Sequence, residues 1–336
     1  MDSAARDRLL ALPTAGLGHW PTPFHRADRF GEAVGAEVWI KRDDVQGVAL
    51  AGNKIRKFDL VIGQALVDGC DTLVTTGAAQ SNSARTGAAS AAAVGMDSVL
   101  VLSGHEPAEP SGNLLLDHLV GSEIRFAGDV DWVTLNATVD AVVADLDAEG
   151  RSAFAAPVGC SSPLGTLGFA RAFLELQGQL DDAGVAPAAI VHASTSGGTH
   201  AGLLLGRSIA GIAPDQLPIV AVDVGAILGD PGVELLALAR EAGAIVGHDL
   251  TLTADEVRVV TDQLGDGYGR HTAAARSAIN LLARTEAVVC DPVYSGKGLA
   301  GLVAFIEQGV AGPVVFWHTG GYHALFDPRH GARHLG

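Results

Sequence analysis

The sequence predicts an α/β protein built on parallel sheets. Short apolar segments alternate along the 336 residues with longer Ala- and Leu-rich segments, and this alternation is typical of parallel strands covered by helices. Hydrophobic residues make up 48% of the chain and charged residues 18%, which suits a large buried core. A chain of this length is expected to form about two domains, although no repeat or low-complexity linker marks a boundary.

The candidate strands are the apolar segments, which are rich in Val, Ile and Leu or bounded by turn residues. They lie at 37–40, 72–75, 98–102, 123–127, 152–156, 188–193, 218–223, 287–290 and 313–317. The segments between them have high helix propensity, most clearly the Ala-rich segment after residue 82. Helices are expected, for example, at 83–94, 111–120, 132–149, 163–180, 199–210, 231–242 and 272–285.

The net charge of −16 argues against nucleic acid or an anionic membrane as a partner. No apolar run approaches the roughly 18 residues of a transmembrane helix, and the first residues lack the order of a signal peptide. The three cysteines, Cys70, Cys160 and Cys290, are odd in number and widely spaced, which indicates a reducing compartment. We therefore expect a cytoplasmic protein.

Lys54 is the strongest candidate for a catalytic residue. An amine becomes a covalent catalyst when burial or neighbouring positive charge lowers its pKa. Lys54 follows the small pair Gly52-Asn53 and lies in a cluster of basic residues, which are Lys41, Arg42, Arg56 and Lys57. An ordinary basic helix face is the alternative interpretation. Together with three further segments, the cluster indicates the lysine of a pyridoxal phosphate (PLP) enzyme.

The first of these segments, Gln80-Ser81-Asn82, falls between a predicted strand and a predicted helix. Free backbone N–H groups and the helix dipole favour an anion there, such as a substrate carboxylate. Simple capping of the helix by Ser81 or Asn82 is the alternative. The second segment, Ser194 to Thr199, leads from an apolar strand into a helix through Gly197 and Gly198. Its composition favours a phosphate site, although it is neither a Walker loop nor GxGxxG.

The third feature is a pair of apolar segments near the C-terminus. Val288 to Gly298 contains Asp291-Pro-Val-Tyr294-Ser295, and Val314 to Gly321 ends in His318-Thr319-Gly320-Gly321. Ligand-binding residues of open parallel sheets gather at the carboxyl ends of strands. These strand ends therefore predict one shared crevice.

In these motifs the chain resembles fold-type II PLP enzymes of the D-cysteine desulfhydrase and 1-aminocyclopropane-1-carboxylate (ACC) deaminase family. The resemblance runs from Pro21-Thr-Pro23 to the final Gly320-Gly321 pair. It implies a two-domain α/β fold like that of the tryptophan synthase β subunit, with a three-layer α/β/α arrangement in each domain. Residues 1–54 plus 163–336 would form the larger, PLP-binding domain, and 55–162 a smaller inserted domain. Homodimerisation is also implied.

The resemblance also implies a role for each motif residue. Lys54 would hold PLP covalently, Lys57 would reach its phosphate, and Asn82 would bind the ring hydroxyl. Ser81 would bind the substrate carboxylate or assist proton transfer. The phosphate would be held by Ser196, Gly197, Gly198 and Thr199. The substrate would be met by Gln80, Ser81, Asn82, Ser161, Tyr268 and Tyr294, of which Tyr268 and Tyr294 are also candidate acids.

Two departures from the family pattern bear on the substrate. Ser295 and Thr319 stand where ACC deaminases have Glu and Leu, as in the desulfhydrase branch. A hydroxyl beside the pyridine nitrogen leaves it largely neutral and makes PLP a weaker electron sink, which disfavours opening of a cyclopropane. Ser83 replaces a family His, which leaves the native substrate open.

The predicted activity is α,β-elimination on a small β-substituted amino acid such as D-cysteine, which yields pyruvate, ammonia and sulfide. The alternatives are an L-cysteate sulfo-lyase, an ACC deaminase-like enzyme, another PLP reaction such as β-replacement, and a non-catalytic binding protein. The handedness of the substrate stays open. No metal is expected, because His330 and His334 lie in a Gly-rich tail that we expect to be disordered.

Overall fold

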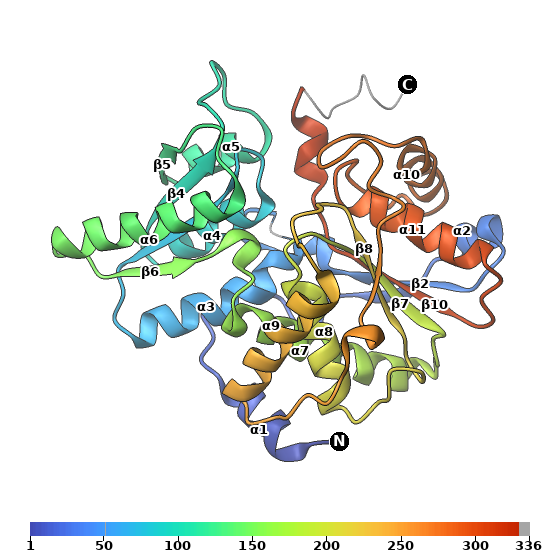
Figure 1. Ribbon diagram of the computed structural model, residues 1–336. Coiled ribbons are helices and arrows are strands. Elements are labelled where there is room, and N and C mark those ends of the chain that lie inside the picture. The colour runs from blue at the N-terminus through green and yellow to red at the C-terminus, as the bar shows by residue number, and fades with distance from the viewer. Residues whose placement is uncertain (51, 329–336) are drawn as a thin grey trace.

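Two sheets, each with helices on both faces, organise the chain (Figure 1). The computed structural model describes residues 1–50 and 52–328, so His330 and His334 lie outside the described residues. The predicted α/β class with parallel sheets is confirmed. Among the described helices, none is long and apolar enough to cross a membrane.

The larger sheet has six strands in the order β1-β2-β10-β7-β8-β9. All neighbours are parallel except β1 and β2. The strands are β1 (Phe24–Arg26), β2 (Val38–Arg42), β7 (Ala189–Ser194), β8 (Ile219–Asp223), β9 (Arg258–Val260) and β10 (Val314–His318).

Helices from distant parts of the sequence cover the two faces of this sheet. One face packs against α2 (Asp28–Val34), α10 (Ala273–Glu286) and α11 (Ser295–Glu307). The other packs against α7 (Pro163–Ala183), α8 (Gly198–Ile209) and α9 (Pro231–Ile245). Because side chains alternate along a strand, Val314 and Phe316 of β10 face the first group of helices, whereas Val315 and Trp317 face the second.

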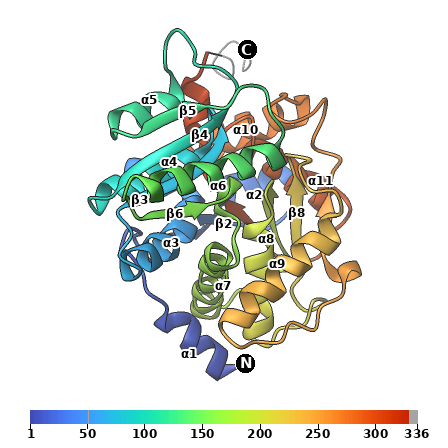
Figure 2. The same cartoon turned by 60° about the vertical axis from the view of Figure 1, so that its left-hand side comes forward.

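The smaller sheet has four parallel strands in the order β5-β4-β3-β6. They are β3 (Thr72–Ala78), β4 (Asp97–Ser103), β5 (Glu123–Phe126) and β6 (Ala153–Ala156). Helix α6 (Trp132–Ala148) covers one face, and α3 (Ile55–Val67), α4 (Asn82–Ala93) and α5 (Gly112–Leu119) cover the other. Helix α1 (Ser3–Ala11) packs against α7 and α8, far from this sheet (Figure 2).

The segment 287–290 is a correction, because it is not a strand. Helix α10 continues to Glu286, and Ala287 ends it with a φ of 55°. The places beside β10 are already taken by β2 and β7, so the segment cannot pair with β10. It is attached instead through His318, whose Nε2 lies 3.0 Å from the carbonyl oxygen of Val289. The other eight predicted strands are confirmed; the three-residue strands β1 and β9 were not predicted.

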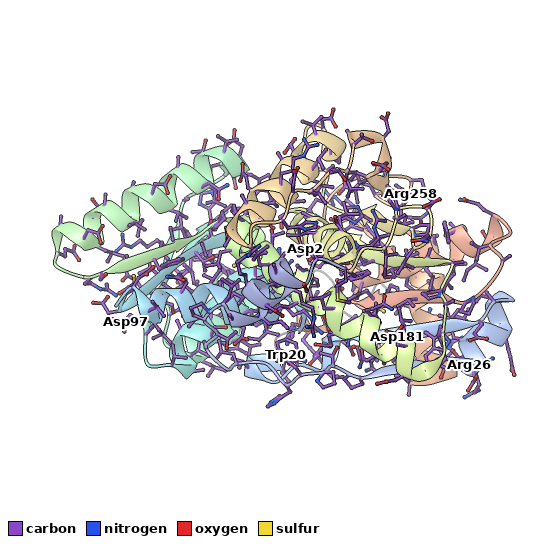
Figure 3. All side chains as sticks on the ribbon, turned by 90° about the horizontal axis from the view of Figure 1, so that it is seen from below. Asp2, Trp20, Arg26, Asp97, Asp181 and Arg258 are labelled. Atoms are coloured by element: carbon purple, nitrogen blue, oxygen red, sulfur yellow. The ribbon has the colours of Figure 1, made fainter. Side chains whose placement is uncertain are left out.

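A buried charged network joins α3 to the larger sheet. Arg56, at the start of α3, donates to Asp43 at 2.7 Å and to Glu175 of α7 at 2.9 Å. Lys41 of β2 also pairs with Glu175, and the Trp20 ring lies 4.3 Å from the Arg56 guanidinium. Seen from below, Trp20 lies between Asp97 near the end of the smaller sheet and Arg26 near the opposite end of the molecule (Figure 3). The network therefore ties α3, which packs on the smaller sheet, to β2 of the larger sheet and to α7 on its face.

Candidate active site

One cavity receives residues from both sheets. The turns after β3 and β7 and the turn after β10 all contribute to its lining, as expected for the carboxyl ends of parallel strands. Nine of the predicted site residues line it: Lys54, Ser81, Asn82, Ser196, Gly197, Thr199, Tyr268, Tyr294 and Thr319. The shared crevice predicted from the sequence therefore exists, although segment 287–290 does not reach it as a strand.

Lys54 presents its amine to this cavity without a competing partner. Among the described residues, no hydrogen bond or ion pair holds the Lys54 Nζ. Burial lowers the pKa of the Lys54 amine to about 8. A substantial fraction of the amine is therefore neutral near physiological pH, as a nucleophile or a general base requires.

The backbone around Lys54 is fixed against the turn that follows β10. Gly52 has a φ of +74°, and a Cβ at this position would stand 2.9 Å from the carbonyl oxygen of Thr319. The N–H of Asn53 donates to that same oxygen at 3.1 Å, and Nδ2 of Asn53 donates to Oγ1 of Thr199 at 3.3 Å. The lysine is thus tied to two other parts of the site.

The N-terminus of α8 forms an anion cradle. Gly197 adopts a φ of +82° as the N-cap, and the first N–H groups of a helix lack intrahelical acceptors. A Cβ at Gly198 would stand 2.6 Å from Nζ of Lys57 and 2.7 Å from Oγ of Ser161. Only glycine lets the loop lie this close to the lysine.

Lys57 lies beneath this cradle and does not line the cavity itself. Its Nζ donates to the carbonyl oxygen of Gly159 at 3.0 Å and to Oγ of Ser161 at 2.9 Å. Burial, and then the neighbouring Lys54, lower the pKa of Lys57 well below its ordinary value. No carboxylate of the described chain pairs with the Lys57 amine, so a phosphate above the loop would supply the negative charge that favours its protonated form.

Ser161 takes a different place from the one expected of a substrate ligand. Its hydroxyl contacts Lys57, lies 2.8 Å from Oγ of Ser196 and accepts from the N–H of Gly198 at 3.2 Å. It therefore supports the phosphate loop from below. Gly159 has no room for a side chain, because a Cβ there would stand 1.9 Å from Oγ of Ser196.

In the Gln80-Ser81-Asn82 motif, Ser81 and Asn82 line the cavity, whereas Gln80 contacts the start of α5. Ser81 caps α4 by accepting from the N–H of Ala84 at 3.1 Å, and both Ser81 and Asn82 line the cavity. Gln80 points elsewhere: its Nε2 donates to the carbonyl oxygen of Ser111, and its Oε1 accepts from the N–H of Asn113, each at 2.8 Å. The side chain of Gln80 is thus engaged with the start of α5 instead of a substrate.

Tyr268 and Tyr294 also line the cavity. Their hydroxyl groups are hydrogen-bonded to each other. Trp132, the first residue of α6, meets Tyr268 edge-on at 6.3 Å between ring centroids. Burial raises the pKa of both tyrosines, so each hydroxyl keeps its proton at neutral pH.

Of the two residues whose hydroxyls are predicted to face the ring nitrogen, Thr319 lines the described cavity and Ser295 does not. Ser295 is fully buried, and its hydroxyl donates to Oδ1 of Asp291 at 2.7 Å. Asp291 also accepts from the N–H groups of Val293, Tyr294 and Ser295. Ser295 therefore shapes the turn before α11 and does not itself reach the cavity.

Sequence reasoning missed Trp132, Ile227 and Val158 in the lining and Asn113 behind it. These residues lie outside every motif, and only tertiary packing brings them to the site. Ser83 also belongs to the cavity lining; this residue is 3% exposed, and its buried hydroxyl has no hydrogen-bond partner among the described residues. The described chain contains no cluster of three or more His, Cys, Asp or Glu placed to hold a metal ion.

Comparisons with known proteins agree with this geometry. The sequence model of the pyridoxal-phosphate dependent enzyme family matches residues 16–320. The D-cysteine desulfhydrase of Salmonella schwarzengrund is 37% identical over 328 residues, which cover 95% of this chain and 97% of that one. The chain belongs to the ACC deaminase and D-cysteine desulfhydrase family of PLP-dependent enzymes.

Solved structures agree with this assignment. The crystal structure of an ACC deaminase homologue has a TM-score of 0.89, 34% identity and 97% coverage of both chains. A fungal L-serine ammonia-lyase from Rhizomucor miehei has a TM-score of 0.64 and 17% identity, covering 95% of this chain and 97% of that one, which shows the shared fold. The predicted fold-type II class and the PLP cofactor are confirmed. The free Lys54 amine and the glycine cradle above Lys57 fit this cofactor.

Proposed function

We propose that this enzyme is a lyase of the D-cysteine desulfhydrase type, which removes the β-substituent of a small amino acid. One observation supports this choice above the others: no Asp or Glu side chain lines the described cavity. The carboxylate of Asp291 is turned toward Ser295 and three backbone N–H groups. Nothing acidic is therefore available to keep a pyridine nitrogen protonated, and a weak electron sink suits good leaving groups such as sulfide.

The residues of the site divide into a base and acids. When bound, PLP supplies an aldehyde that holds the substrate amino group and a ring that accepts the electron pair from the α-carbon. The free Lys54 amine, with its pKa of about 8, removes the α-proton. Ser81 uses its oxygen as the α4 cap, which leaves its O–H to bind the substrate carboxylate.

Proton donation to the leaving group falls to the tyrosine pair. Because their pKa values are raised, Tyr294 and Tyr268 hold protons at neutral pH and act as acids. General acid–base assistance of this kind accelerates a step by roughly 10²–10⁴-fold. The net reaction consumes one water and one cysteine and releases sulfide, ammonia and pyruvate.

The remaining site roles are part of this proposal. Lys54 holds the cofactor, and Asn82 donates to its ring oxygen. Ser196, Gly197, Gly198 and Thr199 hold the phosphate, with Lys57 below. Residues 55–162 are proposed to form the smaller inserted domain between 1–54 and 163–336. The homodimer and the cytoplasmic location stay predictions; light scattering of the purified enzyme tests the first.

A panel of substrates tests the reaction. The purified enzyme is incubated with D-cysteine, L-cysteine, cysteate, β-chloroalanine and ACC, and pyruvate or 2-oxobutyrate is measured. We expect turnover of β-substituted substrates and little of ACC. Lys54→Ala should abolish turnover, and Thr319→Leu should impair it while PLP still binds. Efficient ACC turnover, or full activity of Lys54→Ala, would contradict the proposal.

The second candidate is a cysteate sulfo-lyase, and Ser83 favours it. Ser83 belongs to the cavity lining, and its buried hydroxyl has no hydrogen-bond partner among the described residues, so its O–H is available to donate to a sulfonate oxygen. Release of sulfite instead of sulfide in the same panel would select this candidate. An ACC deaminase-like reaction and β-replacement have no comparable observation in their favour.

A further inference from the structure

Asn113 lies at the centre of a buried network of hydrogen bonds that ends at the cavity. It is the second residue of α5 and is fully buried. Its Nδ2 donates to the carbonyl oxygen of Gln80 at 2.8 Å and to Oδ1 of Asn82 at 3.0 Å. Its Oδ1 accepts from Nε of Arg85 at 2.9 Å. Asn113 does not line the described cavity, and its side chain reaches the lining through its hydrogen bond to the side chain of Asn82.

The partners of Asn113 allow its amide one orientation. A guanidinium only donates hydrogen bonds, whereas a backbone carbonyl only accepts them. Arg85 therefore requires the amide oxygen of Asn113 on its side, and the carbonyl of Gln80 requires the amide nitrogen on the other. Turning the amide over would place two donors against each other at one end and two acceptors at the other end.

The orientation of Asn113 fixes that of Asn82. Because Asn113 presents an N–H group, Asn82 must turn its Oδ1 toward it and its Nδ2 away from it. Nδ2 of Asn82 then points to the side of Gly321, where a Cβ would stand 3.3 Å from that nitrogen. Asn82 consequently offers a donor to the cavity, and a ring oxygen of the cofactor is an acceptor that such a donor suits.

We propose that Asn113 is a positioning residue that makes Asn82 present a donor, and not an acceptor, to the PLP ring oxygen. This inference rests on the role of Asn82 under the proposed function. It also gives Gln80 a function: its amide holds the backbone N–H of Asn113 and so places the positioning side chain.

Asn113→Asp is the most direct test, because aspartate keeps the shape and the contact with Arg85 but replaces the donor by an acceptor. Asn82 would then turn its Nδ2 toward residue 113 and its oxygen toward the cofactor. We expect the Kd for PLP, measured by absorbance titration, to rise about tenfold. We also expect the pH at which the visible band of the bound cofactor changes to move. Asn113→Ala should have the same effects to a smaller extent, and it serves as the second variant if Asn113→Asp does not fold.

A double variant distinguishes positioning from general damage. If Asn113 acts through Asn82, Asn113→Asp should add less than about twofold to the effect of Asn82→Ala on PLP affinity. Ser111→Ala is the matched control. It removes the hydroxyl that donates to Asp327 at 3.2 Å but keeps the carbonyl that accepts from Gln80, so affinity and spectrum should match those of the unmodified enzyme.

The inference is overturned if both Asn113 variants bind PLP with unchanged affinity and an unchanged spectrum. Full addition of the two single effects in the double variant would also overturn it. If Asn82→Ala itself leaves the spectrum unchanged, the proposed role of Asn82 fails, and this inference fails with it. Loss of turnover with an unchanged spectrum in Asn82→Ala would point to the same conclusion.

Discussion

The amine of Lys57 donates to the hydroxyl of Ser161, and that hydroxyl in turn accepts from the N–H of Gly198 at the start of α8. A buried positive charge and the positive end of a helix thus converge on one oxygen. An anion bound near this oxygen would favour both the protonated Lys57 amine and the positive end of the α8 dipole. Under the proposed function, this arrangement would let Lys57, which does not line the cavity, favour the cofactor phosphate.

Lys57→Met should weaken PLP binding by about 10- to 100-fold, as expected for the loss of a charge-assisted interaction. Methionine keeps most of the side-chain volume and removes the charge. The Kd for PLP is measured beside that for pyridoxal, which lacks the phosphate, and the preference for PLP should shrink. Lys297→Met is the matched control, because Lys297 is another buried lysine, and its Nζ donates to the carbonyls of Leu264 and Gly267. An unchanged preference for PLP in Lys57→Met would refute the argument.

The reactivity of Lys54 should rise with pH around a midpoint near 8. Burial lowers the pKa of this amine to about 8 from an ordinary 10.5, although Cys160 partly opposes the shift. Below the midpoint the amine is protonated and unreactive, and above it the neutral form predominates. Competitive acetylation of the cofactor-free protein, followed by mass spectrometry and normalised to the amino group of Met1, measures this. A midpoint near 10.5 would show that the amine is not perturbed.

Ser83→Ala should change the choice of leaving group more than it changes cofactor binding. Removing the unpartnered hydroxyl of this cavity-lining residue should lower kcat/KM for cysteate relative to β-chloroalanine by about threefold to tenfold. Ser90→Ala is the matched control, since Ser90 is another buried serine of α4 without a described partner and does not line the cavity. Equal ratios in Ser83→Ala and Ser90→Ala would remove Ser83 from the determinants of specificity.

Glu175→Gln should destabilise the enzyme by about 3 kcal/mol at pH 7, because Lys41 and Arg56 would keep their buried charges without this carboxylate. Burial alone would raise the pKa of Glu175, but Arg56 and then Lys41 lower it to about 2. The folded-state pKa lies below the ordinary 4.5. The stabilisation is therefore complete above an unfolded-state pKa of about 4.5 and is lost as the pH falls toward 2.

Urea unfolding at pH 7 and pH 3 tests this sign. The difference in the free energy of unfolding between the unmodified protein and Glu175→Gln should be smaller at pH 3 than at pH 7. Glu123→Gln, which removes an exposed ion pair with Arg125, should cost less than about 1 kcal/mol at either pH. If Glu175→Gln lowers the free energy of unfolding at pH 7 as little as Glu123→Gln does, the buried charged network does not stabilise the fold as argued.

The strand ends that form the cavity were predictable because β3, β7 and β10 are apolar runs that stop abruptly at Gly, Ser and Thr residues. Segment 287–290 has the same local pattern, and nothing local distinguishes it. Whether Val288 joins a sheet depends on which edges are still unpaired, and that is decided by β2 and β7 far away in the sequence.

The direction of a side chain was the second limit of prediction. The sequence predicts that Gln80 contacts the substrate and that Ser295 contacts the cofactor. In the structure Gln80 donates to the carbonyl oxygen of Ser111, and Ser295 donates to Asp291. Trp132 and Asn113 reach the site from α6 and α5, and neither belongs to a recognisable motif. Residue types at strand ends predict where a site forms, but the network behind it follows only from tertiary structure.

The lengths of the outermost strands have a consequence for the behaviour of this enzyme in concentrated solution. Strands β1 and β9 have three residues each and β5 and β6 have four, whereas β3 and β4 have seven. Unpaired backbone groups at a sheet margin are templates for aggregation. Here each edge strand offers only a few such groups, so another chain can form few backbone hydrogen bonds with it, and edge-to-edge aggregation should be weak.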